Sequence, residues 1–291
     1  MPRIAPSLMR TACAESRLLP LLLPESRTLE QARTELRWMR AELCGAAAVA
    51  RGCRQRYRGV PLQYVLGTQP FGPLEVRCRR GVLIPRWETE EWACELARRF
   101  AARGRSLRAA DLCTGTGCVG LLLAHSVRGA RVTAVDVSEA AVAAARQNAA
   151  ALRVPLEVVR ADVRQPGGLL RDGVEVVTCN PPYIPTDALP RECTRSVCRY
   201  EPQLALAGDL EFYDNLVDVW LARTDSFVYE VGYAEQSRHV LARIAADPAL
   251  RGVWRVGFRE DARGQPRVVY GYRTAAAGLD AVFEGYGRLM H

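Results

Sequence analysis

The sequence predicts an α/β fold in which a helical segment and a β-hairpin precede an open, parallel sheet. Three observations indicate this class. Apolar runs typical of buried strands alternate with helical patterns after residue 106, a glycine-rich turn follows the first of these runs, and 291 residues suffice for a large core. Ligands of such sheets bind at the carboxyl ends of the strands, near the point where the strand order reverses.

The first element is helical and basic. An apolar residue recurs every three or four positions and forms one stripe along a helix: Leu29, Ala32, Leu36, Met39, Leu43, Ala46 and Ala50. Thr28 with Gln31 predicts a capping box at its start, and Gly52 predicts its end. Residues 1–60 hold 11 Arg and 5 Glu, which is +6 of the net charge of +8. We expect a helical domain over 1–60, whose charge is either a solvated face or a docking surface that includes Arg51, Arg54, Arg56 and Arg58.

A hairpin and then the sheet follow. Alternating apolar segments at 64–71 and 74–78 meet at Gly72-Pro73, which predicts a β-hairpin within a linker over 61–90. The next helix is expected over 90–103. Strands are expected at 107–113, 131–135, 156–160, 174–179, 227–231 and 268–272, with helices at 138–152 and 233–246 between them. Residues 91–291 would form the catalytic domain.

Composition excludes several classes of function. All 40 basic residues are Arg, so a Schiff-base or P-loop lysine is absent, and His125, His239 and His291 leave little for imidazole triads or metal sites. Ten cysteines show neither Cys-x-x-Cys pairs nor zinc-ligand spacing, which indicates reduced thiols inside the cell. The apolar run at 18–23 is far shorter than the roughly 18 residues that span a bilayer. We therefore expect no metal and no membrane span, and a structural role for Cys193 and Cys198.

The glycine-rich turn predicts a cofactor site. Asp111-Leu-Cys-Thr-Gly-Thr-Gly-Cys-Val-Gly120 contains Gly-x-Gly-x-x-Gly between a strand and a helix, where absent side chains let backbone N–H groups approach a ligand. Asp136 ends the next strand, 19 residues after Gly117, where a carboxylate can accept both hydroxyl protons of a ribose. The pair indicates an adenosine-containing cofactor and leaves NAD and S-adenosylmethionine open.

The fourth strand indicates the chemistry. Val174-Glu-Val-Val-Thr-Cys-Asn-Pro-Pro-Tyr183 places Asn180 at the end of an apolar strand, followed by two prolines that cannot donate hydrogen bonds. The Asn180 side-chain oxygen and the Pro181 carbonyl are therefore acceptors suited to the two protons of an NH2 group. Tyr183 adds a ring face for a substrate amide or a positive centre. The simpler interpretation is a turn that ends the strand.

Asn180-Pro-Pro-Tyr183 resembles the signature of S-adenosylmethionine-dependent amino methyltransferases. Together with Gly81-Val-Leu-Ile-Pro-Arg-Trp-Glu-Thr-Glu90 and Arg199-Tyr-Glu-Pro-Gln-Leu-Ala-Leu206, the chain resembles the release-factor glutamine methyltransferases, the HemK family, and most of all the fungal mitochondrial members. The resemblance implies a Rossmann-like methyltransferase sheet with an N-terminal helical domain. It also implies methyl transfer from S-adenosyl-L-methionine to the side-chain N5 of the Gly-Gly-Gln glutamine of a release factor. One departure is Cys113, where the family commonly has glycine.

The resemblance and the motifs together give the expected site. The cofactor is expected to contact Cys113, Thr114, Gly115, Thr116, Gly117, Asp136, Asp162, Val163, Asn180 and Phe71. The substrate is expected to contact Asn180, Pro181, Pro182, Tyr183, Arg86, Thr89 and Glu90, and the first four of these are the expected catalytic residues. The amide needs positioning and polarisation rather than a general base.

Partners and location follow in the same way. The expected partner is a peptide-chain release factor, free or on the ribosome, with no direct nucleic-acid substrate. Residues 1–14 carry Arg3 and Arg10 without an acid, typical of a mitochondrial presequence, although Pro2 and Pro6 weaken its helix. With the fungal resemblance we expect the mitochondrial matrix.

Three other functions remain open from the residues alone. An adenine-N6 nucleic-acid methyltransferase uses the same tetrapeptide on a flipped base, but no base-reading domain is evident. An NAD-dependent oxidoreductase gives residues 180–183 no role. An RNA-binding module would explain the basic end alone.

Overall fold

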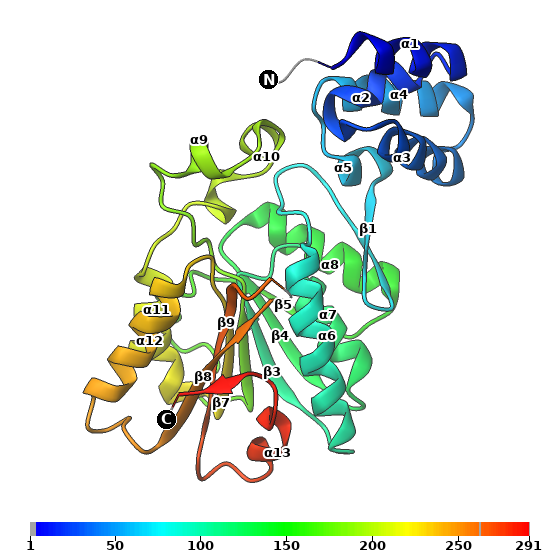
Figure 1. Cartoon of the computed structure of the whole chain (residues 1–291). Coiled ribbons are helices and arrows are strands. Elements are labelled where there is room, and N and C mark those ends of the chain that lie inside the picture. Colours follow the sequence, from blue (N-terminus) through cyan, green and yellow to red (C-terminus); the bar gives the residue numbers. More distant parts are fainter. Residues whose placement is uncertain (1–3, 262, 291) are drawn as a thin grey trace.

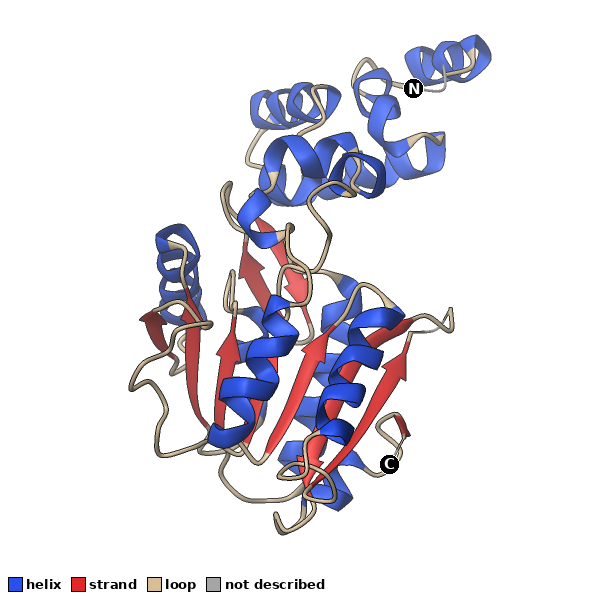
Figure 2. Ribbon diagram, turned by 90° about the vertical axis from the view of Figure 1, so that its left-hand side faces the viewer, coloured by secondary structure: helices blue, strands red, loops and turns tan. Residues whose placement is uncertain are grey.

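The computed structural model describes residues 4–261 and 263–290 and centres on one eight-stranded sheet (Figures 1 and 2). Its strand order is β10-β8-β9-β7-β6-β3-β4-β5. The strands are β3 (Arg108–Leu112), β4 (Arg131–Asp136), β5 (Glu157–Arg160), β6 (Val176–Cys179), β7 (Ser226–Glu230), β8 (Trp254–Glu260), β9 (Pro266–Arg273) and β10 (Arg288–Leu289). The predicted α/β class is confirmed.

The sheet is parallel over β5, β4, β3, β6 and β7, and the strand order reverses at β3. β9 instead pairs antiparallel with both β7 and β8. The expectation of a wholly parallel sheet is therefore wrong at 268–272, because the strand over 254–260 was not predicted and forms a hairpin with β9. The reversal at β3 leaves a crevice at the carboxyl ends of the strands, where ligands of such sheets bind.

Helices cover both faces of the sheet. α6 (Trp87–Ala102), α7 (Cys118–Ser126) and α13 (Leu279–Phe283) contribute to one hydrophobic cluster. The other face carries α11 (Glu211–Asn215), the π-helix η2 (Leu216–Trp220), the 3-10 helix η3 (Leu221–Arg223) and α12 (Ala234–Ala246). α8 (Glu139–Leu152) contacts β4 and β5. Two short helices, α9 (Leu189–Glu192) and α10 (Arg195–Tyr200), and the turn η1 (Gln203–Ala205) follow β6.

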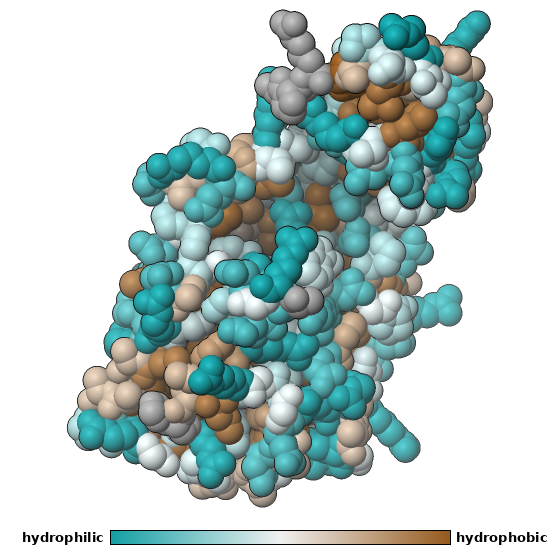
Figure 3. Space-filling view, in the orientation of Figure 1, coloured by the Kyte–Doolittle hydropathy of each residue, from teal (hydrophilic) through white to brown (hydrophobic). Residues whose placement is uncertain are grey.

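The N-terminal helices share a hydrophobic cluster that contains no residue of the sheet. They are α1 (Pro6–Glu15), α2 (Leu19–Ser26), α3 (Leu29–Glu42), α4 (Ala46–Tyr57) and α5 (Leu62–Leu66). Figure 3 shows apolar atoms of this region at its upper right, surrounded by hydrophilic residues. Residues 1–3, where part of the presequence pattern falls, lie outside the described residues.

The predicted capping box is confirmed in part: the Thr28 side chain accepts from the Gln31 N–H at 3.2 Å, but the Thr28 N–H donates to the Ser26 carbonyl at 2.8 Å. The single long helix and its end at Gly52 are wrong. The helix breaks before Gly45, which has a φ of +84°, and resumes as α4. Gly52 instead lies inside α4, where a Cβ would approach a Val65 methyl group to 2.9 Å. Close helix packing, rather than termination, accounts for this glycine.

Arg56 does not belong to the exposed basic surface. Its side chain is buried and its Nε and Nη2 donate to the two carboxylate oxygens of Glu35 at 2.8 and 2.9 Å. Arg51, Arg54 and Arg58 are exposed. The basic surface of α4 and its C-terminal end therefore consists of these three arginines.

The hairpin prediction is confirmed in part. β1 (Thr68–Phe71) pairs antiparallel with β2 (Leu74–Arg77), but residues 62–66 are helical. Asn148 joins the hairpin to the sheet: its Oδ1 accepts from the Arg77 N–H at 2.9 Å, and its Nδ2 donates to the Thr116 carbonyl at 2.9 Å. The hairpin is thereby fixed next to the glycine-rich turn.

Candidate active site

A pocket lies at the carboxyl ends of β3, β4 and β6, at the reversal of strand order. It brings together eleven of the predicted site residues: Arg86, Thr89, Cys113, Thr114, Gly115, Thr116, Asp136, Asp162, Val163, Asn180 and Pro182. The wall also includes Arg164 and Phe212, which the sequence did not single out, and Leu204 of the motif at 199–206. The Arg164 guanidinium carbon lies 5.7 Å from the Phe212 ring centroid. A motif search misses Arg164 and Phe212 because Arg164 lies in the turn after β5 and Phe212 lies in α11, outside the quoted motifs.

Asp111 shapes the glycine-rich turn from below. Its buried Oδ2 accepts from the Thr114 hydroxyl and from the Gly120 N–H at 3.0 Å, and its Oδ1 accepts from the Thr178 hydroxyl at 2.9 Å. Burial raises the pKa of Asp111 to about 6, while these donors act in the opposite direction. The carboxyl group therefore holds the turn against the start of α7 and the neighbouring strand β6.

The backbone conformation of Cys113 shows why the related proteins commonly have glycine at this position. Its φ is +53°, in the left-handed region that glycine adopts most readily. The small cysteine side chain is accommodated there beside the pocket. Gly115 also has a positive φ, +58°, and a Cβ at this position would meet no described atom within 4 Å. The turn is therefore open toward the pocket at Gly115.

Asp136 lies opposite the turn. Its Oδ2 accepts from the Gly115 N–H and its Oδ1 from the Ser138 N–H, both at 2.9 Å. Burial raises the pKa of Asp136, and these backbone donors act against that rise. Each carboxylate oxygen retains a lone pair for a further donor in the pocket.

Thr116 supplies an observation that points to a ligand. Its side chain is 2% exposed and lines the pocket, yet within the described part of the chain its hydroxyl has no hydrogen-bond partner other than the weak acceptor of the nearby Cys118 thiol. Buried hydroxyl groups are nearly always paired. Together with the Asp136 carboxylate and the open backbone at Gly115, this weakly paired hydroxyl fits a polar cofactor such as S-adenosylmethionine.

Asn180 stands between two cavities. It lines the pocket at the strand ends and also an adjoining cavity with Tyr183 and Cys193, and Arg86 lines both as well. The Asn180 Nδ2 donates to the Thr89 hydroxyl oxygen at 3.1 Å. Its Oδ1 forms no hydrogen bond with the described residues. The side-chain oxygen is therefore available to a donor.

Tyr183 is fixed by the region that follows β7. The Gln236 side-chain amide donates to the Tyr183 carbonyl at 2.9 Å. A Cβ at Gly232 would lie 2.5 Å from the Tyr183 ring, so glycine is required for this close approach. Tyr183 lines the adjoining cavity rather than the first pocket.

Glu201 accounts for the second quoted motif. Its buried carboxylate accepts from the Ile84 N–H at 3.0 Å and from Arg86 Nη2 at 2.8 Å. Two motifs that lie more than 100 residues apart are thus joined at the rim of the pocket. Sequence reasoning gave Glu201 no role of its own.

Four predicted residues lie outside both cavities. Phe71 is fully buried in the hydrophobic cluster with α6 and α7, so the hairpin's apolar contacts hold it away from the pocket. Glu90 accepts from the Gly72 N–H at 2.8 Å and stabilises the hairpin turn. Gly117 caps the N-terminus of α7, where a Cβ would lie 3.1 Å from the Ala145 Cβ, and Pro181 is buried.

A group of metal-binding side chains and a helix able to span a membrane are both absent from residues 4–261 and 263–290. In those ranges no three His, Cys, Asp or Glu side chains are grouped to hold a metal ion. None of the helices described is long and apolar enough to cross a membrane. All ten cysteines are free, and Cys193 lines the adjoining cavity.

Comparisons with known proteins agree with this geometry. The model of a family described as methyltransferase small domain matches residues 94–210. The chain is 41% identical over 301 residues to the mitochondrial MRF1 N(5)-glutamine methyltransferase MTQ1 of Saccharomyces cerevisiae, covering 100% of this chain and 96% of that protein. It is 44% identical over 158 residues to the release factor glutamine methyltransferase of Mycolicibacterium smegmatis, which covers 53% of each.

The fold is also similar to that of solved structures. The N-terminal domain of human METTL16 in complex with SAH aligns with a TM-score of 0.52 and 17% sequence identity, covering 76% of this chain and 83% of that chain. At this identity the likeness concerns the fold alone.

Proposed function

Because this chain belongs to the family of release-factor N5-glutamine methyltransferases, we infer that it methylates the side-chain amide nitrogen of a release-factor glutamine, with S-adenosyl-L-methionine as methyl donor. Its full-length similarity to a yeast mitochondrial member places this activity in the mitochondrion. The target glutamine is that of the Gly-Gly-Gln motif. The protein is thus an enzyme of translation termination.

One observation carries the assignment. Asn180 lines both the pocket with the glycine-rich turn and the adjoining cavity, and its Oδ1 is unpaired among the described residues. A cofactor held in the first cavity and an amide held in the second would therefore meet at this side chain. An oxidoreductase would have no use for such an acceptor.

The chain's own residues act by position. The Asn180 Oδ1 accepts one proton of the glutamine NH2 group, whereas the Pro181 carbonyl, which the sequence predicts as the second acceptor, belongs to a buried residue that lines neither cavity. An amide nitrogen is a weak nucleophile because its lone pair is delocalised, and holding the amide at Asn180 orients that lone pair without removing a proton first. Tyr183 forms the wall of the cavity beside the amide. After transfer the nitrogen carries the methyl group and both protons, and one of these two protons leaves to solvent, which restores a neutral amide.

The cofactor supplies an electrophilic methyl group on a sulfonium centre. Asp136 is proposed to accept the ribose hydroxyl groups, and the Thr116 hydroxyl and the Gly115 backbone to face the polar end of the cofactor. Asp162 and Val163 are proposed to border the adenine. Asp162 is held by Arg164, whose Nη2 donates to it at 3.0 Å, and this pairing lowers the pKa of Asp162. These roles fit the pocket lining.

The division of the chain is a proposal of the same kind. We propose that residues 1–60 dock the release factor, that 61–90 link the two parts, and that 91–291 carry the catalytic site. The separate hydrophobic cluster of the N-terminal helices supports this division. The exposed Trp38 and Tyr57, which are 49% and 58% accessible, lie on these helices.

The experiment is Asn180→Ala, with transfer of a labelled methyl group to the release factor as the readout. Loss of one polar holder of this kind typically costs about 100-fold to 1,000-fold in turnover. Cofactor affinity, measured by calorimetry, should remain close to that of the unchanged protein. Turnover that survives the substitution would contradict the assignment.

A further inference from the structure

The buried carboxylate of Glu230 lies next to the site and is not among the residues proposed to contact the cofactor or the amide. Glu230 ends β7, is 1% exposed, and lies beside the strand that leads to Asn180. Burying a carboxylate costs free energy unless hydrogen bonds compensate for the lost water, so the contacts of Glu230 indicate what it does. Those contacts converge on the residues that surround the substrate amide.

One oxygen of Glu230 accepts two hydrogen bonds. The Trp92 indole Nε1 donates to Oε2 at 2.9 Å, and the Thr89 hydroxyl donates to the same oxygen at 2.6 Å. An indole N–H can only donate, so Oε2 must be an acceptor. Burial raises the pKa of Glu230, but a proton would then sit on Oε1, and Oε2 would still accept.

The direction of the next hydrogen bond follows. Thr89 has a single hydroxyl proton, and it donates that proton in the hydrogen bond to Glu230 Oε2. The Thr89 oxygen can therefore only accept from Asn180, which lies 3.1 Å away. The Asn180 amide must therefore present its NH2 group to Thr89. If the amide were flipped, the Asn180 Oδ1 would face the Thr89 hydroxyl oxygen, and both are acceptors. Thr89 is 2% exposed, so water could not compensate for this unfavourable contact. Oδ1 is thereby directed away from Thr89.

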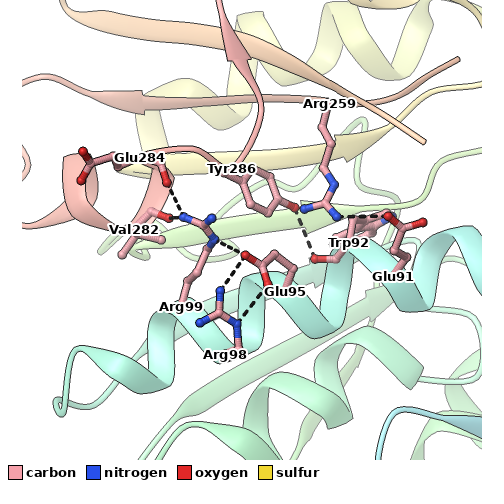
Figure 4. Close-up of polar contacts among 9 residues, drawn as sticks. All are labelled: Glu91, Trp92, Glu95, Arg98, Arg99, Arg259, Val282, Glu284 and Tyr286. Atoms are coloured by element: carbon pink, nitrogen blue, oxygen red, sulfur yellow. Dashed lines mark hydrogen bonds and ion pairs between the residues drawn. The ribbon is translucent and has the colours of Figure 1, made fainter. Parts of the chain in front are cut away.

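The support for this arrangement extends behind Trp92. The Tyr286 hydroxyl donates to the Trp92 carbonyl at 3.3 Å, and the neighbouring Glu91 pairs with Arg259 at 3.2 Å (Figure 4). The C-terminal segment and β8 therefore hold the first turns of α6, which carry both Thr89 and Trp92. On the other side, the Tyr183 hydroxyl lies 3.5 Å from Glu230 Oε1.

We propose that Glu230 is a positioning residue for methyl transfer: through Thr89 it fixes the Asn180 amide so that its oxygen faces the substrate NH2 group. This rests on the proposed function of Asn180. Thr89 is then not primarily a substrate contact, as the family resemblance implies, but the acceptor that sets the orientation of Asn180.

The test compares paired variants in the full-length protein. Thr89→Val keeps the shape but removes the acceptor, whereas Thr89→Ser keeps the hydroxyl. Glu230→Leu removes the acceptor for Thr89, whereas Glu230→Gln can place its carbonyl oxygen at the position of Oε2. The measured quantities are kcat and the KM for the release factor, the affinity for S-adenosylhomocysteine, and the thermal midpoint.

Misorientation on the scale of an ångström costs about 10-fold to 100-fold in rate, so Thr89→Val and Glu230→Leu should lower kcat by that factor. Cofactor affinity and KM should change by less than about 3-fold, because neither residue is asked to bind by itself. The serine and glutamine variants should retain most of kcat. Since Glu230 acts through Thr89, the double variant should be no slower than the slower single variant.

Three results would overturn the proposal: unchanged kcat in Thr89→Val, equal losses in the valine and serine variants, or additive losses in the double variant. If Thr89→Val lowered the thermal midpoint enough to unfold the protein, the Glu230→Gln and Glu230→Leu pair would give the same decision. Asn180→Ala in the same assay separates the two hypotheses. If it retains activity, the proposed function fails, and if it alone loses activity, only the role of Glu230 fails.

Discussion

A methyl group added at Gly208 is expected to displace the segment that holds the substrate amide. The Cβ position of an alanine there lies 2.2 Å from the Pro182 carbonyl oxygen and 2.8 Å from its carbonyl carbon. The segments around Pro182 and Gly208 cannot move apart freely, because two hydrogen bonds join them. The Ile184 N–H donates to the Leu206 carbonyl, and the Gly208 N–H donates to the Ile184 carbonyl, each at 3.0 Å. Gly208→Ala therefore strains the loop at the point where it passes the pocket.

The size of the effect follows from the overlap. Ordinary contact begins at 3.4 Å, so the Pro182 carbonyl must move by 3.4 − 2.2 = 1.2 Å. The two prolines have fixed φ angles, which carries the shift back to the Pro181 carbonyl and Asn180. A misplacement of about 1 Å costs on the order of 100-fold in rate, or roughly 2.7 kcal/mol in the activation free energy.

The assay measures kcat for methyl transfer to the release factor, together with the affinity for the cofactor and the thermal midpoint. Gly168→Ala is the matched control, because a Cβ there would approach its nearest atom, Arg171 Nε, only to 3.7 Å. We expect a loss of kcat in Gly208→Ala alone, with cofactor affinity retained. A folded Gly208→Ala protein with kcat within about 3-fold of the control would refute the reasoning.

Two further predictions concern stability and docking. The Arg98 and Arg99 guanidinium groups lower the pKa of Glu95 from 4.5 to about 2, and Arg99 in turn donates to the carbonyls of residues 282 and 284 (Figure 4). Because the folded pKa is depressed, this stability is present above pH 4.5 and is lost as the pH falls toward 2. The group is partly exposed and screened by solvent, so Glu95→Gln should cost about 1 kcal/mol in urea unfolding at pH 7, and an equal cost at pH 3 would contradict the pairing. Replacing the exposed arginines of α4 and its C-terminal end by glutamate (Arg51, Arg54 and Arg58) should raise the KM for the release factor by about 10-fold at low salt and less at high salt, with cofactor affinity unchanged. A KM that does not move would leave these arginines a role in solubility alone.

Local patterns predicted the parts of the site that one strand and its following turn supply. Gly115, Asp136 and Asn180 each follow an apolar run, and the carboxyl ends of adjacent parallel strands meet, so their proximity follows from the strand order. The extent of the parallel region was overestimated, because an apolar run does not reveal the direction of its partner. Gly52 was assigned as a helix end, but its contact with Val65 is a packing requirement invisible in the periodicity.

Contacts between distant residues were not predictable. Thr89 and Glu230 are 141 positions apart, and Ile84 and Glu201 are 117 apart. Each of these acidic residues lies in an ordinary position, a strand end or a loop, and its role depends on which donor the fold brings to it. Phe71 was expected in the pocket from the family resemblance alone. The structure instead places it in the hydrophobic cluster with α6 and α7.

The most direct test of the central claim is mass-spectrometric mapping of the methyl group after the protein is incubated with S-adenosyl-L-methionine and a mitochondrial release factor, with ribosomal RNA in a parallel reaction. We expect one methyl group on the Gly-Gly-Gln glutamine of the release factor, and its loss with Asn180→Ala. Methylated adenine in the RNA with an unmodified release factor would contradict it.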